Sequence, residues 1–134
     1  MPKSADIIVV DDDPDIRDVL RMILEGAGHK VRVARESQEA LQLLEERIPN
    51  LMILDIMMNT DTEGFDLMHQ IKDTPETSEL PVILLTSFLG KVSADGVGDF
   101  DYIMGEQWSA SWIFEKPVNK EKLLKQIDAI LDEK

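Results

Sequence analysis

The chain contains no cysteine, few aromatic residues and about half as many basic as acidic residues. It has 14 Lys and Arg against 27 Asp and Glu, which gives a formal charge of −13. The absence of cysteine excludes disulfides and thiolate metal sites. The acidic excess argues against direct binding to nucleic acid or to anionic membranes, because phosphate backbones require clustered Lys and Arg.

Long apolar runs and a signal peptide are also missing. No apolar stretch approaches the length of a membrane span, and Met1–Ala5 leads into the first strand pattern without a signal-peptide core. We therefore expect a cytoplasmic protein with no membrane partner. Its length suits one domain, and we expect a single domain over residues 1–134 with no output domain in this chain.

Four short apolar runs stop abruptly at polar residues. Such runs are typical of strands buried on both faces of a parallel sheet. Because parallel strands end at one edge of a sheet, we expect three carboxylates, one hydroxyl and one ammonium to gather there. This set suits a divalent cation with a phosphoryl group. The runs are Ile7–Val10, Leu51–Leu54, Pro81–Leu85 and Trp112–Phe114, and the polar residues at their ends are Asp11, Asp12, Asp55, Thr86 and Lys116.

Helical patterns alternate with these strand patterns. Apolar residues at helical spacing predict four helices, with Asp13, Ser37 and Asn119 as N-caps of three of them. Glycines interrupt the stretch 88–111, where we expect loop and one short helix. The predicted apolar faces carry Ile16, Val19, Leu20, Ile23 and Leu24; Ala40, Leu41, Leu44 and Ile48; Phe65, Leu67, Met68 and Ile71; and Leu123, Leu124, Ile127, Ile130 and Leu131.

A weaker strand pattern at Val31–Ala34 brings the number of predicted strands to five. Five strands alternating with helices predict an α/β fold with a doubly wound parallel sheet. Right-handed crossovers place helices on both faces of that sheet. Periodicity alone does not give the order of the strands.

The order of the polar motifs resembles the receiver domain of two-component response regulators. The motifs are Val9-Val10-Asp11-Asp12, Leu54-Asp55, Leu85-Thr86-Ser87 and Lys116-Pro117, and the resemblance covers essentially the whole chain. It implies a flavodoxin-like sheet with strand order 2-1-3-4-5.

The resemblance also implies a role in phosphorelay signalling. Asp55 would accept a phosphoryl group from a sensor histidine kinase or a histidine phosphotransfer protein, and the domain would signal by binding a downstream protein whose identity is unknown. The implied cofactor is Mg²⁺, or Mn²⁺, bound by Asp11, Asp12, Asp55 and the backbone carbonyl of Met57.

Two further residues complete the implied site. Lys116 would pair with the acceptor carboxylate and then with the phosphoryl oxygens, and Thr86 would hydrogen-bond one of those oxygens. The chain would be a phosphoacceptor rather than an enzyme, with at most self-phosphorylation from phosphodonors and slow self-dephosphorylation. Met57 and Phe88 stand where this family flanks the attacking water, and neither side chain can orient water by hydrogen bonding.

Three departures from the family pattern concern the response to phosphate. Asn59 replaces the expected proline after the acceptor, and Thr86 and Lys116 lie 30 positions apart, several more than usual. Ile113 stands where many receivers carry the aromatic residue that moves with the threonine. A degenerate receiver that acts as a phosphate-independent interaction module is therefore the alternative.

A second alternative is a phosphatase of the haloacid dehalogenase type, which also uses aspartate and Mg²⁺. Such enzymes carry an Asp-x-Asp nucleophile motif at the first strand. In this chain the acidic residues Asp11 and Asp12 are adjacent, and the acceptor candidate Asp55 follows the Leu51–Leu54 run, so this reading is disfavoured.

Overall fold

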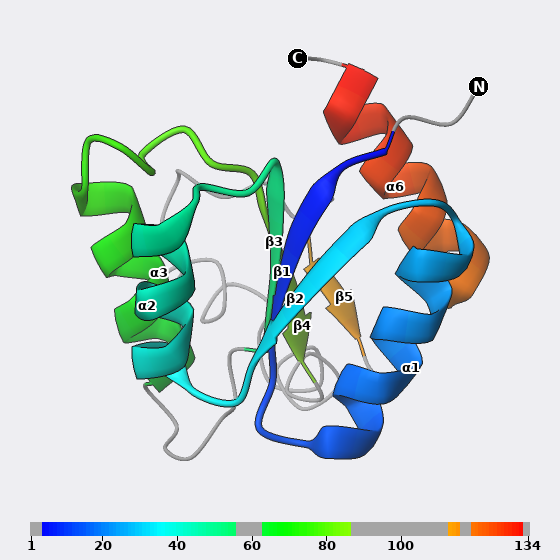
Figure 1. The fold of residues 1–134 in the computed structure, drawn as a ribbon, viewed down its shortest axis with the longest axis horizontal. Coiled ribbons are helices and arrows are strands. Elements are labelled where there is room, and N and C mark those ends of the chain that lie inside the picture. The colour runs from blue at the N-terminus through cyan, green and yellow to red at the C-terminus, as the bar shows by residue number, and fades with distance from the viewer. Residues whose placement is uncertain (1–3, 56–62, 87–112, 116–118, 133–134) are drawn as a thin grey trace, which may run out of the picture.

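The computed structural model describes residues 4–55, 63–86, 113–115 and 119–132 of the chain. A parallel sheet lies at its centre, with helices on both faces (Figure 1). Within these ranges no helix is long and apolar enough to cross a membrane. The strands are β1 (Asp6–Val10), β2 (Lys30–Ala34), β3 (Leu51–Asp55), β4 (Val82–Thr86) and β5 (Ile113–Glu115), and the helices are α1 (Pro14–Gly26), α2 (Ser37–Glu46), α3 (Glu63–Asp73) and α6 (Lys120–Asp132).

The strands lie in the order β2-β1-β3-β4-β5. The four longer strands thus have the predicted order 2-1-3-4, and all of them are parallel. β5 is a three-residue segment that pairs with β4 and places Ile113 opposite Leu84. Trp112 and the predicted loop and helix in 88–111 lie outside the described residues.

The sheet is covered by two separate cores, because successive residues of a strand point to opposite faces. Helices α2 and α3 cover one face, and α1 and α6 cover the other (Figure 1). Both cores need apolar side chains from the same strand, which explains why the strand sequences are unbroken apolar runs. The first core contains Ile8, Val10, Met52, Leu54, Val82 and Leu84 from the strands, and the second contains Ile7, Val9, Leu51, Ile53, Ile83 and Leu85.

Two of the three predicted helix caps are confirmed. The Asp13 carboxylate accepts a hydrogen bond from the Asp15 N–H at 2.9 Å, and the Asn119 side chain accepts one from the Lys122 N–H at 3.0 Å. The prediction for Ser37 was wrong by one position, since Ser37 is the first residue of α2 and Glu36 occupies the N-cap position.

Two residues predicted on buried helix faces are exposed instead. Val19 is 51% exposed, because α1 packs on the sheet through a stripe centred on Leu20 and Leu24, and Val19 lies at its margin. Ile48 is 42% exposed, because α2 ends at Glu46 before the predicted apolar face is complete. The exposure of Ile48 leaves an aliphatic side chain at the surface beside the end of α2.

An ion-pair network holds the end of α2 against the sheet. The Arg32 guanidinium makes two hydrogen bonds to the Asp6 carboxylate, at 3.2 and 3.0 Å, and donates to the carbonyls of Leu43 and Arg47. The Arg47 side chain also donates to Asp6 at 2.7 Å. Burial would raise the pKa of Asp6, but the hydrogen bonds from Arg47 and Arg32 outweigh it and keep that pKa below its ordinary value. The network thus joins the start of β1, the middle of β2 and the end of α2.

His29 makes a second contact at the edge where the strands begin. It is 5% exposed, and its Nδ1 accepts a hydrogen bond from the Ala5 N–H at 3.1 Å. An acceptor Nδ1 requires the neutral ring with its proton on Nε2. Burial lowers the pKa of His29 from its ordinary value, against the smaller opposing effect of the Asp128 charge.

We predict that His29 makes the protein less stable as the pH falls. The unfolded chain binds a proton at the ordinary histidine pKa of about 6.5, whereas the folded chain takes it up at a lower pH. Below about pH 6.5 the unfolded state therefore holds more protons, and the free energy of unfolding drops by up to about 1.4 kcal/mol per pH unit until the folded pKa is reached. Urea unfolding at a series of pH values measures this slope.

Replacing His29 by Asn isolates this contribution. The Asn Oδ1 can still accept the Ala5 N–H, but it does not titrate, so the slope should become shallower. His69, an exposed residue of α3, supplies the control: His69→Asn should leave the slope as in the unmodified protein. Equal effects of the two substitutions would contradict the assignment to His29.

Candidate functional site

Three carboxylates come together at the edge of the sheet where the strands end. Asp55 is the last residue of β3 and Asp11 directly follows β1, and the register that pairs Val10 with Leu54 brings these positions side by side. One oxygen from each of Asp11, Asp12 and Asp55 lies within 4.8 Å of the other two. Asp11 and Asp55 are buried, and Asp12 is exposed. The grouping predicted for these three residues is therefore present.

The turn between β1 and α1 holds Asp11 in place through its own backbone and its carboxylate. The Asp11 N–H donates to the Ala34 carbonyl at 3.1 Å, which extends the pairing with β2 beyond the strand. Its Oδ1 accepts the Asp13 N–H at 2.9 Å, while Asp13 in turn caps α1. The same turn thus starts a helix and orients a buried carboxylate toward Asp12 and Asp55.

Arg17 supports this turn, although the sequence did not lead us to predict a role for it. Its guanidinium donates to the backbone carbonyl of Asp11 at 2.8 Å from the first turns of α1. A signal was present, since cations are disfavoured near a helix N-terminus and a long side chain there points back toward the preceding loop. An arginine three residues after the Pro14 start could therefore have been suspected of a specific contact.

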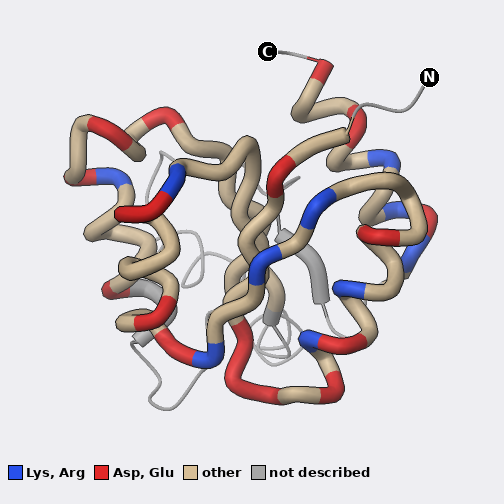
Figure 2. The backbone as a smooth tube through the Cα atoms, viewed as in Figure 1, with Lys and Arg blue, Asp and Glu red and all other residues tan. Residues whose placement is uncertain are grey.

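The donor set fits a hard divalent cation. Burying carboxylates is costly unless their charge is offset, and three of them within 4.8 Å repel one another. Carboxylate oxygens are the ligands that Mg²⁺ and Ca²⁺ prefer. Figure 2 shows further acidic positions along the β1–α1 turn, so the electrostatic potential of this edge favours a cation.

The other predicted site residues are described less fully. Thr86 is the last residue of β4 and pairs with Glu115 of β5, so its backbone lies at the same edge, one step beyond Asp55, which pairs with Leu85. Its side chain is not described. Lys116 follows β5 directly in the sequence, and both Lys116 and Met57 lie outside the described residues. Their roles stay predictions.

Comparison with known proteins gives one consistent result. Residues 7–128 match the sequence model described as the response regulator receiver domain. Protein PilH of Pseudomonas aeruginosa is 32% identical over 95% of this chain and 98% of its own length. An uncharacterized protein of Leptolyngbya boryana is 46% identical over 63% of this chain and 64% of that protein. The chain spans 50% of the transcriptional regulatory protein AfsQ1 of Streptomyces coelicolor, so whole-protein activities of such relatives do not carry over directly.

Solved structures agree with the sequence matches. The signal receiver domain of a signal transduction histidine kinase from Syntrophus aciditrophicus superposes with a TM-score of 0.79 and 26% identity. The match covers 97% of this chain and 92% of that one. The parallel sheet and its flanking helices are therefore those of a flavodoxin-like receiver fold.

We predict that removing one carboxylate stabilises the protein when divalent cations are absent. In the presence of a chelator, Asp12→Asn should raise the free energy of unfolding by up to about 1 kcal/mol, because it relieves repulsion with Asp11 and Asp55 at an exposed position. Thermal unfolding should show this as a midpoint about 2–4 °C higher.

Asp13→Asn is the matched control for this experiment. Asp13 is also acidic, exposed and in the same turn, but it is not part of the three-carboxylate cluster. Asn can keep its N-cap hydrogen bond, and loss of a negative charge at a helix N-terminus is neutral or slightly unfavourable. A midpoint that rises equally for both variants would refute the proposed repulsion.

Proposed function

The chain belongs to the response regulator receiver domain family, and from this premise we propose that it accepts a phosphoryl group on Asp55 in a two-component phosphorelay. The observation that carries the proposal is the buried Asp55 at the end of β3, with Asp11 and Asp12 beside it. A carboxylate at this position can act as a nucleophile toward phosphorus, as in enzymes that form an aspartyl phosphate.

The proposed reaction is a simple exchange of bonds. A phosphohistidine on a sensor histidine kinase or a histidine phosphotransfer protein presents its phosphoryl group, and an Asp55 oxygen attacks the phosphorus. The P–N bond breaks as the P–O bond forms, and the histidine leaves with a proton taken from solvent. Such transfers depend on positioning and on neutralising the negative charge rather than on further covalent chemistry.

Asp11, Asp12 and Asp55 would hold Mg²⁺ or Mn²⁺, together with the Met57 carbonyl. The ion would supply charge neutralisation between the carboxylates and the phosphoryl oxygens. Asp11 is suited to this role because the Asp13 N–H and the Arg17 contact hold it in one orientation. Family resemblance adds two roles to the proposal: Lys116 pairs with the phosphoryl oxygens and Thr86 hydrogen-bonds one of them.

The proposed output is protein binding in the cytoplasm, with no direct contact to nucleic acid or membrane.

A single observation favours the alternative of a phosphate-independent module. β5 places Ile113 in the strand beside β4, at the position where receivers usually carry an aromatic residue. Isoleucine has no hydroxyl and a stiff χ1, so the usual coupling between the threonine and an aromatic side chain is unavailable.

The proposal predicts that Asp55 is phosphorylated by a small phosphodonor. Incubation with acetyl phosphate and Mg²⁺ should add one phosphoryl group, detectable by intact-protein mass spectrometry, and Asp55→Asn should abolish the addition. Asp18→Asn, which changes an exposed carboxylate of α1, should leave it intact. Phosphorylation that persists in Asp55→Asn would overturn the assignment.

A binding experiment with the unmodified protein distinguishes a receiver that switches on phosphorylation from a module that binds its partner constitutively. Beryllofluoride with Mg²⁺ mimics the phosphorylated state at the acceptor. A partner captured from the source organism more strongly with beryllofluoride supports a switching receiver, whereas capture that is equal with and without it supports the interaction module.

We further predict that the phosphorylated state is long-lived. Met57 and Phe88 are apolar at the positions that flank the attacking water in this family, so hydrolysis should be slow. Decay of the phosphorylated protein in Mg²⁺ should be measured after removal of acetyl phosphate. Met57→Asn should accelerate decay by about tenfold or more, because a positioned polar group can orient the attacking water. A half-life of seconds in the unmodified protein would be incompatible with this prediction.

A further inference from the structure

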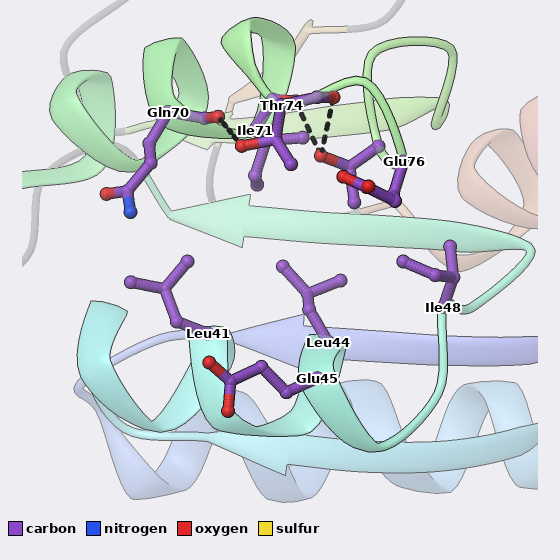
Figure 3. A pocket seen from close by; sticks show the side chains of 9 residues that line it. Leu41, Leu44, Glu45, Ile48, Gln70, Ile71, Thr74 and Glu76 are labelled. Atoms are coloured by element: carbon purple, nitrogen blue, oxygen red, sulfur yellow. Dashed lines mark hydrogen bonds between the residues drawn. The ribbon is translucent and has the colours of Figure 1, made fainter.

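A cleft of about 470 Å³ lies between α2 and α3, at the edge of the sheet opposite the carboxylates (Figure 3). Leu41 and Leu44 of α2 and Ile48 beyond its end point into the cleft, toward Ile71 of α3. Its volume is within the range of pockets that bind a ligand or a side chain of a partner. The cleft exists because α2 ends at Glu46, which leaves Ile48 at the surface instead of in a helix face.

Hydrogen bonds within the protein shape the α3 side of the cleft. The Thr74 hydroxyl donates to the Gln70 carbonyl at 2.8 Å, and the Thr77 hydroxyl donates to the Ile71 carbonyl at 2.6 Å. These bonds occupy the hydroxyl protons of both threonines at the end of α3. The groups left for recognition of a bound group are the apolar floor, the Gln70 side-chain amide and the carboxylates at the rim.

The rim is acidic. Glu45 and Glu76 line the cleft, both are exposed, and within the described ranges neither carboxylate is paired with a cation. The neighbouring cations have other contacts: Arg47 binds Asp6, and Lys72 donates to the carbonyls of Ser78 and Leu80. Figure 2 shows acidic positions at the ends of both helices, with basic positions among them. An apolar floor beneath carboxylates is complementary to an apolar side chain flanked by cations.

The shape favours an extended chain over a compact small molecule. An adjoining hollow of about 380 Å³ shares Ile48 and Glu76 with the cleft and continues to Glu79. The combined groove follows the ends of α2 and α3, and the glutamates that line it along its length are Glu45, Glu76 and Glu79. A second copy of this chain is a poor occupant, because each copy has a formal charge of −13.

We propose that this groove binds a short basic segment of a partner protein. One leucine-sized side chain of the segment enters between Leu44 and Ile71, and Lys or Arg residues on either side pair with Glu45 and Glu76. The exposed Ile48 covers the apolar side chain once it is bound. This interaction is separate from phosphoryl transfer and does not depend on Asp55.

The test uses the full chain and the peptide acetyl-Gly-Lys-Arg-Leu-Lys-Arg-Gly-amide. Titration is followed by ¹⁵N–¹H correlation spectra at roughly physiological ionic strength, to suppress non-specific charge effects. It should shift amides of residues 41–48, 70–74, 76 and 77. Amides of α1 and α6 should not move. Shifts concentrated on α1 or α6 would overturn the proposal.

Paired variants separate specific binding from general attraction. Glu45→Lys/Glu76→Lys should weaken peptide binding by about tenfold or more, whereas Asp18→Lys/Glu25→Lys, with the same change of net charge on α1, should weaken it by less than about threefold. Equal losses would show that only net charge matters and would refute the groove.

The apolar anchor is tested on both partners. Ile48→Ser, at an exposed position that should tolerate the change, and replacement of the peptide leucine by serine should each weaken binding by about tenfold. Unchanged affinity in both cases would exclude an apolar contact. Self-association of the unmodified protein that Ile48→Ser abolishes in sedimentation experiments would assign the groove to a second copy instead.

Discussion

The structure depends on a parallel sheet that must be apolar on both of its faces. Residues of β1 alternate between the core under α2 and α3 and the core under α1 and α6, so Ile7 to Val10 are all fully buried. No polar residue fits within such a strand, and charge is displaced to its ends. Charged groups therefore gather at the ends of the buried strands: three carboxylates where β1 and β3 end, and Asp6 at the start of β1, which pairs with Arg32 of β2 and Arg47 after α2.

At the edge where the strands end, contacts that involve backbone groups hold Asp11 in position. Asp11 is anchored to β2 through Ala34, to the helix start through Asp13, and to α1 through Arg17. These contacts oppose the mutual repulsion of three clustered carboxylates, which would otherwise separate. A site of clustered carboxylates gains stability when a cation, or a phosphoryl group with its cation, binds to it.

The strands and the carboxylate cluster could be predicted from the sequence, but the contacts that hold them in place could not. Abrupt ends of apolar runs predicted that Asp11 and Asp55 share an edge, because parallel strands align their ends. The pairing of Asp6 with Arg32 and Arg47 could not be predicted, since it joins residues 26 and 41 positions apart. Helical spacing likewise placed Ile48 on a buried face, but α2 ends at Glu46, and Pro49 next to Ile48 is unfavourable for continuing the helix.

Strand β1 is held in place at both of its ends. β1 is clamped at its first residue, where Asp6 is bound by two arginines from β2 and the end of α2, and it carries Asp11 just past its other end. Packed side chains of the two cores enclose the strand along its length, and the Asp11 N–H bonds its far end to β2. A change of charge at Asp11 therefore acts on a strand that is held at both ends, and the close packing around it opposes bending.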